Sequence, residues 1–126
     1  MKLRGIVLLA HGSRDAKWRE PFDLLAGKIA KRLPDTAVRV SFLKDLEPDI
    51  YAAVDGLAKA GATHITVVPV FLAAGGHSGN DFPVMANRLS VEHPGVKFRW
   101  TEVIGSWEEV IEAMAVAVCA KEDGEC

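Results

Sequence analysis

The stretch IVLLAHGSRD, residues 6–15, joins an apolar run to a histidine, a glycine and a group of polar residues. Residues 4–10 are almost continuously apolar, which is typical of a strand covered on both faces of a parallel sheet. A helix is expected next, because Ser13 is a suitable N-cap and apolar residues follow at helical spacing as far as Pro34. His11 is therefore predicted to lie at the carboxyl end of a buried strand, just before a helix.

The same alternation of strand and helix recurs along the chain. Apolar runs predict strands over 4–10, 37–43, 64–72 and 96–103. Helical spacing and capping residues predict helices over 14–33, 49–60, about 81–91, and from a capping box of Ser106 and Glu109 onward. This alternation predicts a mainly parallel, four-stranded sheet in the flavodoxin-like order 2-1-3-4, with helices on both faces. We expect one domain over residues 1–126, with a frayed tail from about residue 120.

Composition excludes several classes of protein. The chain has 126 residues, 49% of them hydrophobic, and a net charge of −2, so no basic surface for nucleic acid or membrane is expected. Apolar runs stop short of the roughly 20 residues of a membrane span, and the apolar N-terminus lacks a cleavage site. Cys119 and Cys126 are too few and too close for a disulfide framework, which favours a reducing, cytoplasmic location.

Two histidines are predicted to lie at the ligand-binding edge of a sheet with the strand order 2-1-3-4. Ligands bind beyond the carboxyl ends of the strands where the winding direction reverses, here between the first and third strands. His11 follows the first strand and His77 lies in the glycine-rich segment after the third, predicted to be a loop. Imidazole binds first-row divalent metals and takes up a proton near neutral pH, so the pair predicts an open, exchangeable metal site. We expect structural or surface roles for His64 and His93.

Two other enzyme classes share part of these motifs. The segment GHSGN at 76–80 resembles the GxSxG nucleophile elbow of α/β-hydrolases. Asn80 replaces the second glycine, and His93 is the only histidine after Ser78, so a serine hydrolase is a weak alternative. Phosphohistidine phosphatases carry an arginine before the His-Gly pair, where this chain has Ala10.

The combination of motifs resembles a known family. LLAHGSRD, EPDI after the second strand, the VVPVFL…GGH…NDFP block and VIGSW before the last helix are similar to the small CbiX-type sirohydrochlorin chelatases, of the class II chelatase group. The resemblance covers roughly residues 4–118. It implies a lyase that inserts Co²⁺, or Fe²⁺ or Ni²⁺, into sirohydrochlorin for cobalamin or sirohaem biosynthesis, with the metal as substrate and no permanently bound cofactor. It also implies a homodimer, because the small form is about half of a two-domain chelatase.

The resemblance also assigns roles to individual residues. His11 and His77 match the metal-binding, catalytic histidines. Some relatives place a glutamate at the end of the second strand, where this chain has Lys44, with Glu47 slightly later. Sirohydrochlorin carries eight carboxylates, so basic side chains, backbone amides and open glycines are expected to bind it. The predicted substrate-binding residues are Ser13, Arg14, Lys44, Gly75, Gly76 and Arg88.

A non-catalytic carrier stays open as an alternative. A metal- or tetrapyrrole-binding carrier of the same fold would use the same two histidines, because binding and insertion need the same ligands. Only catalytic turnover separates the two functions.

Overall fold

The computed structural model describes residues 3–122, and for residues 76–80 it describes the backbone alone. One sheet contains β1 (Leu3–Ala10), β2 (Thr36–Phe42), β3 (Ala62–Pro69) and β4 (Lys97–Trp100). Its order is β2-β1-β3-β4, and each neighbouring pair is parallel. The predicted sheet and its strand order are therefore confirmed.

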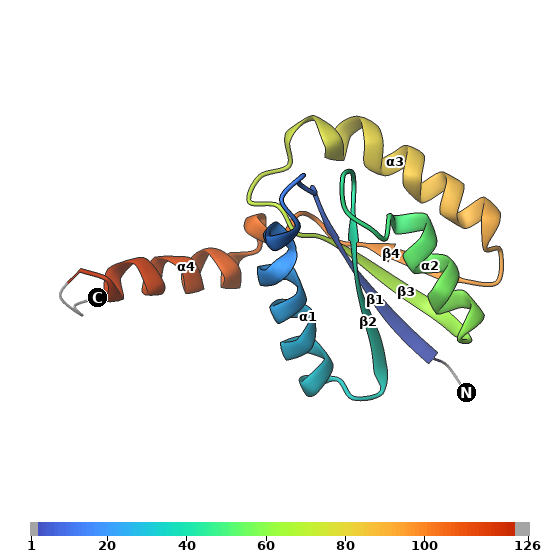
Figure 1. Cartoon of the computed structure of the whole chain (residues 1–126), viewed down its shortest axis with the longest axis horizontal. Helices are drawn as coiled ribbons and strands as arrows, with labels where there is room; N and C mark the ends of the chain where they lie inside the picture. The colour runs from blue at the N-terminus through green and yellow to red at the C-terminus, as the bar shows by residue number, and fades with distance from the viewer. Residues whose placement is uncertain (1–2, 123–126) are drawn as a thin grey trace.

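Helices cover both faces of this sheet, as predicted. The helical segments of the chain are η1 (Ala16–Arg19), α1 (Glu20–Arg32), α2 (Ile50–Lys59), α3 (Gly75–Glu92), η2 (Ile104–Ser106) and α4 (Glu108–Ala120). Figure 1 shows α1 on one face and α2 and α3 on the other, whereas α4 extends away from the rest of the molecule. Within the described residues, no helix is long and apolar enough to cross a membrane.

The alternation of side chains along β1 explains its continuous apolar sequence. Val7 and Leu9 point into a core shared with α2 and α3, whereas Leu8 and Ala10 point into a core shared with α1. All four side chains are fully buried. Both faces of β1 are therefore covered along its second half, and the chain becomes accessible again where His11 follows.

The first helix begins differently from the prediction. Instead of one helix over 14–33 capped by Ser13, the 3₁₀ turn η1 precedes α1 and is capped by Asp15, whose carboxylate accepts the Lys17 N–H. The Ser13 hydroxyl accepts the Asp15 N–H at 3.1 Å. Serine and aspartate are comparable capping residues, so the sequence did not distinguish these two positions.

The third helix begins earlier than predicted. It starts at Gly75, whereas the sequence favoured a start near Asp81. Glycine disfavours helix and proline favours a first turn, which together predicted a loop ahead of Pro83. The helix instead runs through Pro83 at the loss of one backbone donor. His77 therefore lies in the first turns of α3 and not in a loop.

Three further differences concern the start of the last helix and the ends of the third and fourth strands. The predicted capping box is wrong, because the Ser106 hydroxyl donates to the Val103 carbonyl at 2.8 Å and Trp107 is the N-cap of α4. The third and fourth strands end at Pro69 and Trp100, before their predicted ends at 72 and 103. The predicted tail falls largely on residues 123–126, which are outside the described range.

Candidate functional site

His11 lies beside the switch point of the sheet. It follows β1, which pairs with β2 on one side and β3 on the other. Its half-buried ring meets the edge of Phe71, with 6.5 Å between ring centroids, and its Nδ1 is 3.2 Å from the Gly12 carbonyl oxygen. The imidazole is thus held against the segment that follows β3, as the position of the two strands predicted.

The backbone around His11 is fixed by close contact between two loops. The Leu43 N–H donates to the Ala10 carbonyl at 2.9 Å, and the Lys44 N–H donates to the His11 carbonyl at 3.1 Å. Gly12 has a φ of 101°, and a Cβ there would lie 1.8 Å from the Lys44 carbonyl oxygen. Only glycine fits this position, so the His-Gly pair of the sequence has a direct structural reason.

A hollow of about 440 Å³ opens beside the imidazole. We call it the His11 hollow; its lining is His11, Leu43, Lys44, Asp81, Val84 and Met85. It brings together an imidazole, an ammonium group and a carboxylate from three separate loops and helices. Such a mixture can bind a metal ion and an anionic ligand side by side.

Asp81 is a member of this site that the sequence interpretation missed. Its carboxylate lines the His11 hollow from α3. The sequence placed the start of a helix at Asp81 and searched for an acidic group only near Lys44. The available signal was the spacing of four residues between His77 and Asp81, which becomes one helical turn once α3 begins at Gly75.

The other predicted site residues differ in where they lie. Lys44 lines the His11 hollow, and its side chain is exposed. Arg14 is exposed in the loop after His11, two residues before η1. Gly75 opens α3 with a φ of 59°, and Gly76 follows it in the same helix. The side chain of His77 lies outside the described residues.

Arg88 is engaged elsewhere on α3. Its Nε lies 3.1 Å from the Glu92 carboxylate, and its guanidinium stacks over the Tyr51 ring at 3.8 Å. The hydrogen bond that Arg88 donates to the Glu92 carboxylate raises the pKa of Arg88 above its ordinary value. Arg88 is not part of the lining of the His11 hollow.

The two remaining histidines lie away from the hollow. His64 is at the opposite end of β3, where its Nδ1 is 3.0 Å from the Thr63 hydroxyl. His93 is the C-cap of α3, and its N–H donates to the Leu89 carbonyl. Both positions agree with the predicted structural roles.

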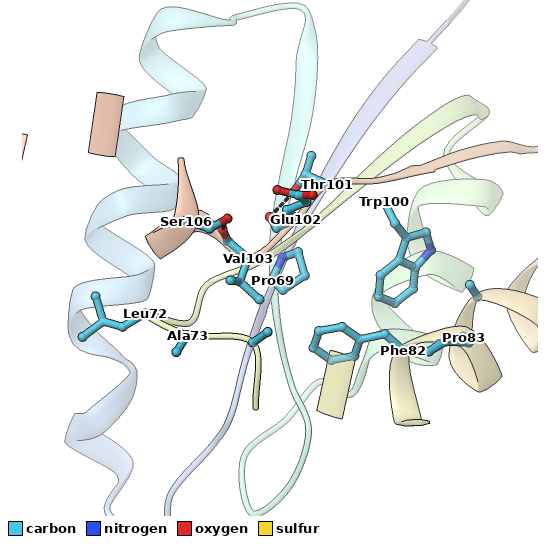
Figure 2. A pocket seen from close by; sticks show the side chains of 12 residues that line it. Pro69, Leu72, Ala73, Phe82, Pro83, Trp100, Thr101, Glu102, Val103 and Ser106 are labelled. Carbon is cyan, nitrogen blue, oxygen red and sulfur yellow. Dashed lines mark hydrogen bonds between the residues drawn. The ribbon is translucent and has the colours of Figure 1, made fainter. Parts of the chain in front are cut away.

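A second, larger recess lies on the other side of the start of α3. We call it the Trp100 recess; Figure 2 shows it between the ends of β3 and β4 and the residues Phe82 and Pro83. Its volume is about 730 Å³, and Glu102 is the one charged residue among those that line it. The lining of the Trp100 recess contains no basic side chain that could pair with the carboxylates of a ligand. The His11 hollow, which includes Lys44, suits a ligand with many carboxylates better.

The described residues hold no closed metal site. Among residues 3–122, leaving out the side chains of 76–80, no group of three His, Cys, Asp or Glu residues could hold a metal ion. The nucleophile elbow that GHSGN resembles is not formed, because residue 78 lies inside α3 and not on a strand-to-helix turn.

Comparison with known proteins identifies the family. The sequence pattern of the CbiX family matches residues 5–120. This chain belongs to the CbiX family. It is 39% identical over 91 residues to the sirohydrochlorin cobaltochelatase of Methanosarcina acetivorans, covering 72% of this chain and 68% of that protein. The resemblance given by the two histidine motifs is thereby confirmed.

Two solved structures superpose closely on this chain. A cobalamin biosynthesis CbiX protein from Marinobacter aquaeolei superposes with a TM-score of 0.83 at 36% identity, covering 95% of this chain and 98% of that one. The sirohydrochlorin chelatase SirB from Bacillus subtilis, solved in complex with cobalt, gives a TM-score of 0.80 at 30% identity. That match covers 97% of this chain and 51% of SirB, so the chain spans about half of the longer CbiX relative.

Proposed function

We propose that this protein inserts a divalent metal ion, Co²⁺ foremost, into sirohydrochlorin. The observation that carries the proposal is the His11 hollow, in which an imidazole, Lys44 and Asp81 meet at the switch point of a CbiX fold. The relatives named as cobaltochelatase and as ferrochelatase support metal insertion in general. Cobalt is proposed over iron because cobaltochelatases predominate among those relatives.

The reaction exchanges two protons for one metal ion. Sirohydrochlorin loses its two pyrrole protons, the hydrated M²⁺ loses water, and the four ring nitrogens take the metal. His11 would hold the entering ion through its unprotonated nitrogen, and that nitrogen would accept a pyrrole proton once the ion has passed to the ring. His77 lies one turn before Asp81, and residues four apart share a helix face, so we propose that it completes the metal site from α3.

Asp81 would supply the acidic group that some relatives carry at the end of β2, where this chain has Lys44. Its carboxylate can attract the cation into the His11 hollow and relay protons to solvent, because it is exposed. Lys44 and Arg14 would pair with carboxylates on the rim of the tetrapyrrole. Gly75 and Gly76 would leave room for the macrocycle beside the start of α3.

Replacing Asp81 by asparagine should lower the rate of metal insertion by about 10- to 100-fold while leaving the fold intact. Asparagine keeps the size of the side chain but removes its charge and its proton affinity. The measurement is the initial rate of spectral change with Co²⁺ and sirohydrochlorin. The matched control is Asp55→Asn, because Asp55 pairs with Lys59 on α2 and should not affect the rate. Equal rates for the two variants would exclude a role for Asp81.

The proposal is tested by anaerobic mixing of substoichiometric protein with sirohydrochlorin and Co²⁺, Fe²⁺ or Ni²⁺ in turn. We expect conversion of all the tetrapyrrole faster than in a mixture without protein. The relative rates would rank the three metals. A spectral change that ends at one equivalent of protein would instead establish a carrier.

We further propose that the protein acts in the cytosol, as one domain in each subunit of a homodimer. The length ratio supports the dimer, because a second copy would supply the half that SirB carries within one chain. The low cysteine content supports a reducing compartment.

A further inference from the structure

Four aromatic rings form a continuous row from His11 to the end of β4. The His11 ring meets the Phe71 ring edge to face, with 6.5 Å between centroids and 61° between planes. Phe71 lies 5.8 Å from Phe82 of α3, and Phe82 lies 5.6 Å from Trp100. Rings at such distances attract one another. We call these four residues the aromatic row. It joins the His11 hollow to the Trp100 recess, where Figure 2 shows Phe82 beside Trp100.

The aromatic row is anchored in the core behind His11. Phe82 is 7% exposed and belongs to the core that α2 and α3 share with the sheet. Phe71 and Trp100 are half-buried and pack against the same core. Side chains in a close-packed interior have little room to change rotamer. The three rings therefore form a rigid support on one side of the half-buried imidazole.

The backbone at Phe71 is fixed from two sides. The Val70 N–H donates to the Leu9 carbonyl at 2.8 Å, which ties this segment to the end of β1. The Phe71 carbonyl accepts the Gly105 N–H at 2.9 Å, which ties it to η2. Because β1 ends just before His11, the first of these hydrogen bonds also fixes the position of Phe71 relative to His11.

The orientation of the imidazole decides which of its nitrogens can bind a metal ion. The His11 Nδ1 lies 3.2 Å from the Gly12 carbonyl oxygen. A carbonyl oxygen can only accept, so a hydrogen bond between these two atoms requires the proton on Nδ1. The neutral ring then carries its lone pair on Nε2, which is the nitrogen that can bind a cation. A ring that turned away from Gly12 would lose this preference between the two tautomers.

We propose that Phe71 is a positioning residue that holds the His11 ring beside the Gly12 carbonyl, so that Nε2 is the nitrogen available to the metal. The edge-to-face contact restricts rotation of the imidazole, and Phe82 keeps Phe71 from moving away. Phe71 does not line the His11 hollow or the Trp100 recess, so it acts through His11 and not by touching a ligand. The inference rests on the proposed metal site and names the residue that orients its first ligand.

The test reads the tautomer of His11 directly, by ¹⁵N NMR of its ring in alkaline buffer, where imidazole is neutral. Phe71→Leu removes the ring and keeps an apolar side chain, whereas Phe71→Tyr keeps the ring. The matched control is Phe98→Leu, because Phe98 is half-buried against the same core but lies outside the aromatic row. The wild-type chain, Phe71→Tyr and Phe98→Leu should show the Nδ1–H form. Phe71→Leu should show a large share of the Nε2–H form.

A titration with Co²⁺ in the absence of tetrapyrrole gives the second measurement. Phe71→Leu should bind Co²⁺ about 10-fold more weakly than the wild-type chain, since losing a group that orients a metal ligand typically costs at least that factor. Phe71→Tyr and Phe98→Leu should bind it as the wild-type chain does. Circular dichroism checks the fold of each variant, and Phe71→Met replaces Phe71→Leu if the latter does not fold.

The outcomes separate this inference from the proposed function. An Nε2–H form in the wild-type chain, or the Nδ1–H form retained in the folded variant without the ring, would overturn the positioning role whatever the Co²⁺ affinity. The same loss in Phe98→Leu would also overturn it, because general loosening of the core would then be the cause. A wild-type chain that fails to insert metal, but whose His11 tautomer changes in Phe71→Leu alone, would refute metal insertion and leave the positioning role supported.

Discussion

Alanine at both His11 and His77 is expected to reduce metal insertion to the rate measured without protein, a loss of about 10²- to 10⁴-fold. His11 lines the His11 hollow, its side chain is half-buried, and neither hydrophobic core includes it. The variant should therefore fold normally while losing the imidazoles that hold the ion and accept pyrrole protons. The measurement is the initial rate with Co²⁺ and sirohydrochlorin, together with a thermal melt.

The matched control removes the other two histidines. His64→Ala/His93→Ala alters the far end of β3 and the C-terminus of α3, so turnover should stay close to that of the wild-type protein. The single variants His11→Ala and His77→Ala separate the two roles. A folded double variant at His11 and His77 with normal turnover would contradict the mechanism, because no second pair of imidazoles reaches the His11 hollow among the described residues.

The fold was predictable because local and global signals agree. The apolar run of β1 reflects burial on both faces, as Val7 and Leu8 show by pointing into opposite cores. The alternation of strands and helices then restricts the strand order, since crossovers in a parallel sheet are right-handed and short. The boundaries were less predictable, because at Ser13 and Asp15 two suitable caps compete.

The candidate site was predicted in part. His11 and Lys44 meet in one hollow, as expected from their places after β1 and β2. Asp81 was missed because the intrinsic cost of glycine in a helix hid the first turns of α3, which tertiary packing of Phe82 and Met85 can offset. Propensity is a local quantity, whereas the start of α3 depends on contacts with the sheet.

The outward direction of α4 was not predictable either. The capping box of Ser106 and Glu109 is a local signal, but the Ser106 hydroxyl bonds to Val103, and η2 packs against Leu72. The sequence does show an apolar run from 113 to 120, which is typical of a helix but carries no signal for its direction. The Gly105 hydrogen bond to Phe71 and the N-cap at Trp107 fix where α4 begins, and no residue of α4 is buried.

Replacing Gly12 by alanine is expected to lower the free energy of unfolding by about 2–5 kcal/mol. Alanine disfavours the φ of 101° found here, and its Cβ would lie 1.8 Å from the Lys44 carbonyl oxygen. The loops after β1 and β2 would have to separate, which would break the hydrogen bond from Lys44 N–H to the His11 carbonyl. The measurement is urea denaturation followed by circular dichroism, with the rate of metal insertion measured on the folded fraction.

Gly27→Ala is the matched control, because Gly27 lies exposed in the middle of α1 with no atom within 4 Å of an added Cβ. This change should raise the free energy of unfolding by about 0.5–1 kcal/mol, since alanine stabilises a helix interior relative to glycine. It should leave metal insertion unchanged. Should Gly12→Ala be as stable and as active as Gly27→Ala, the contact with the Lys44 carbonyl would not be what positions His11, and the geometry of the His11 hollow would have to be set by Phe71 instead.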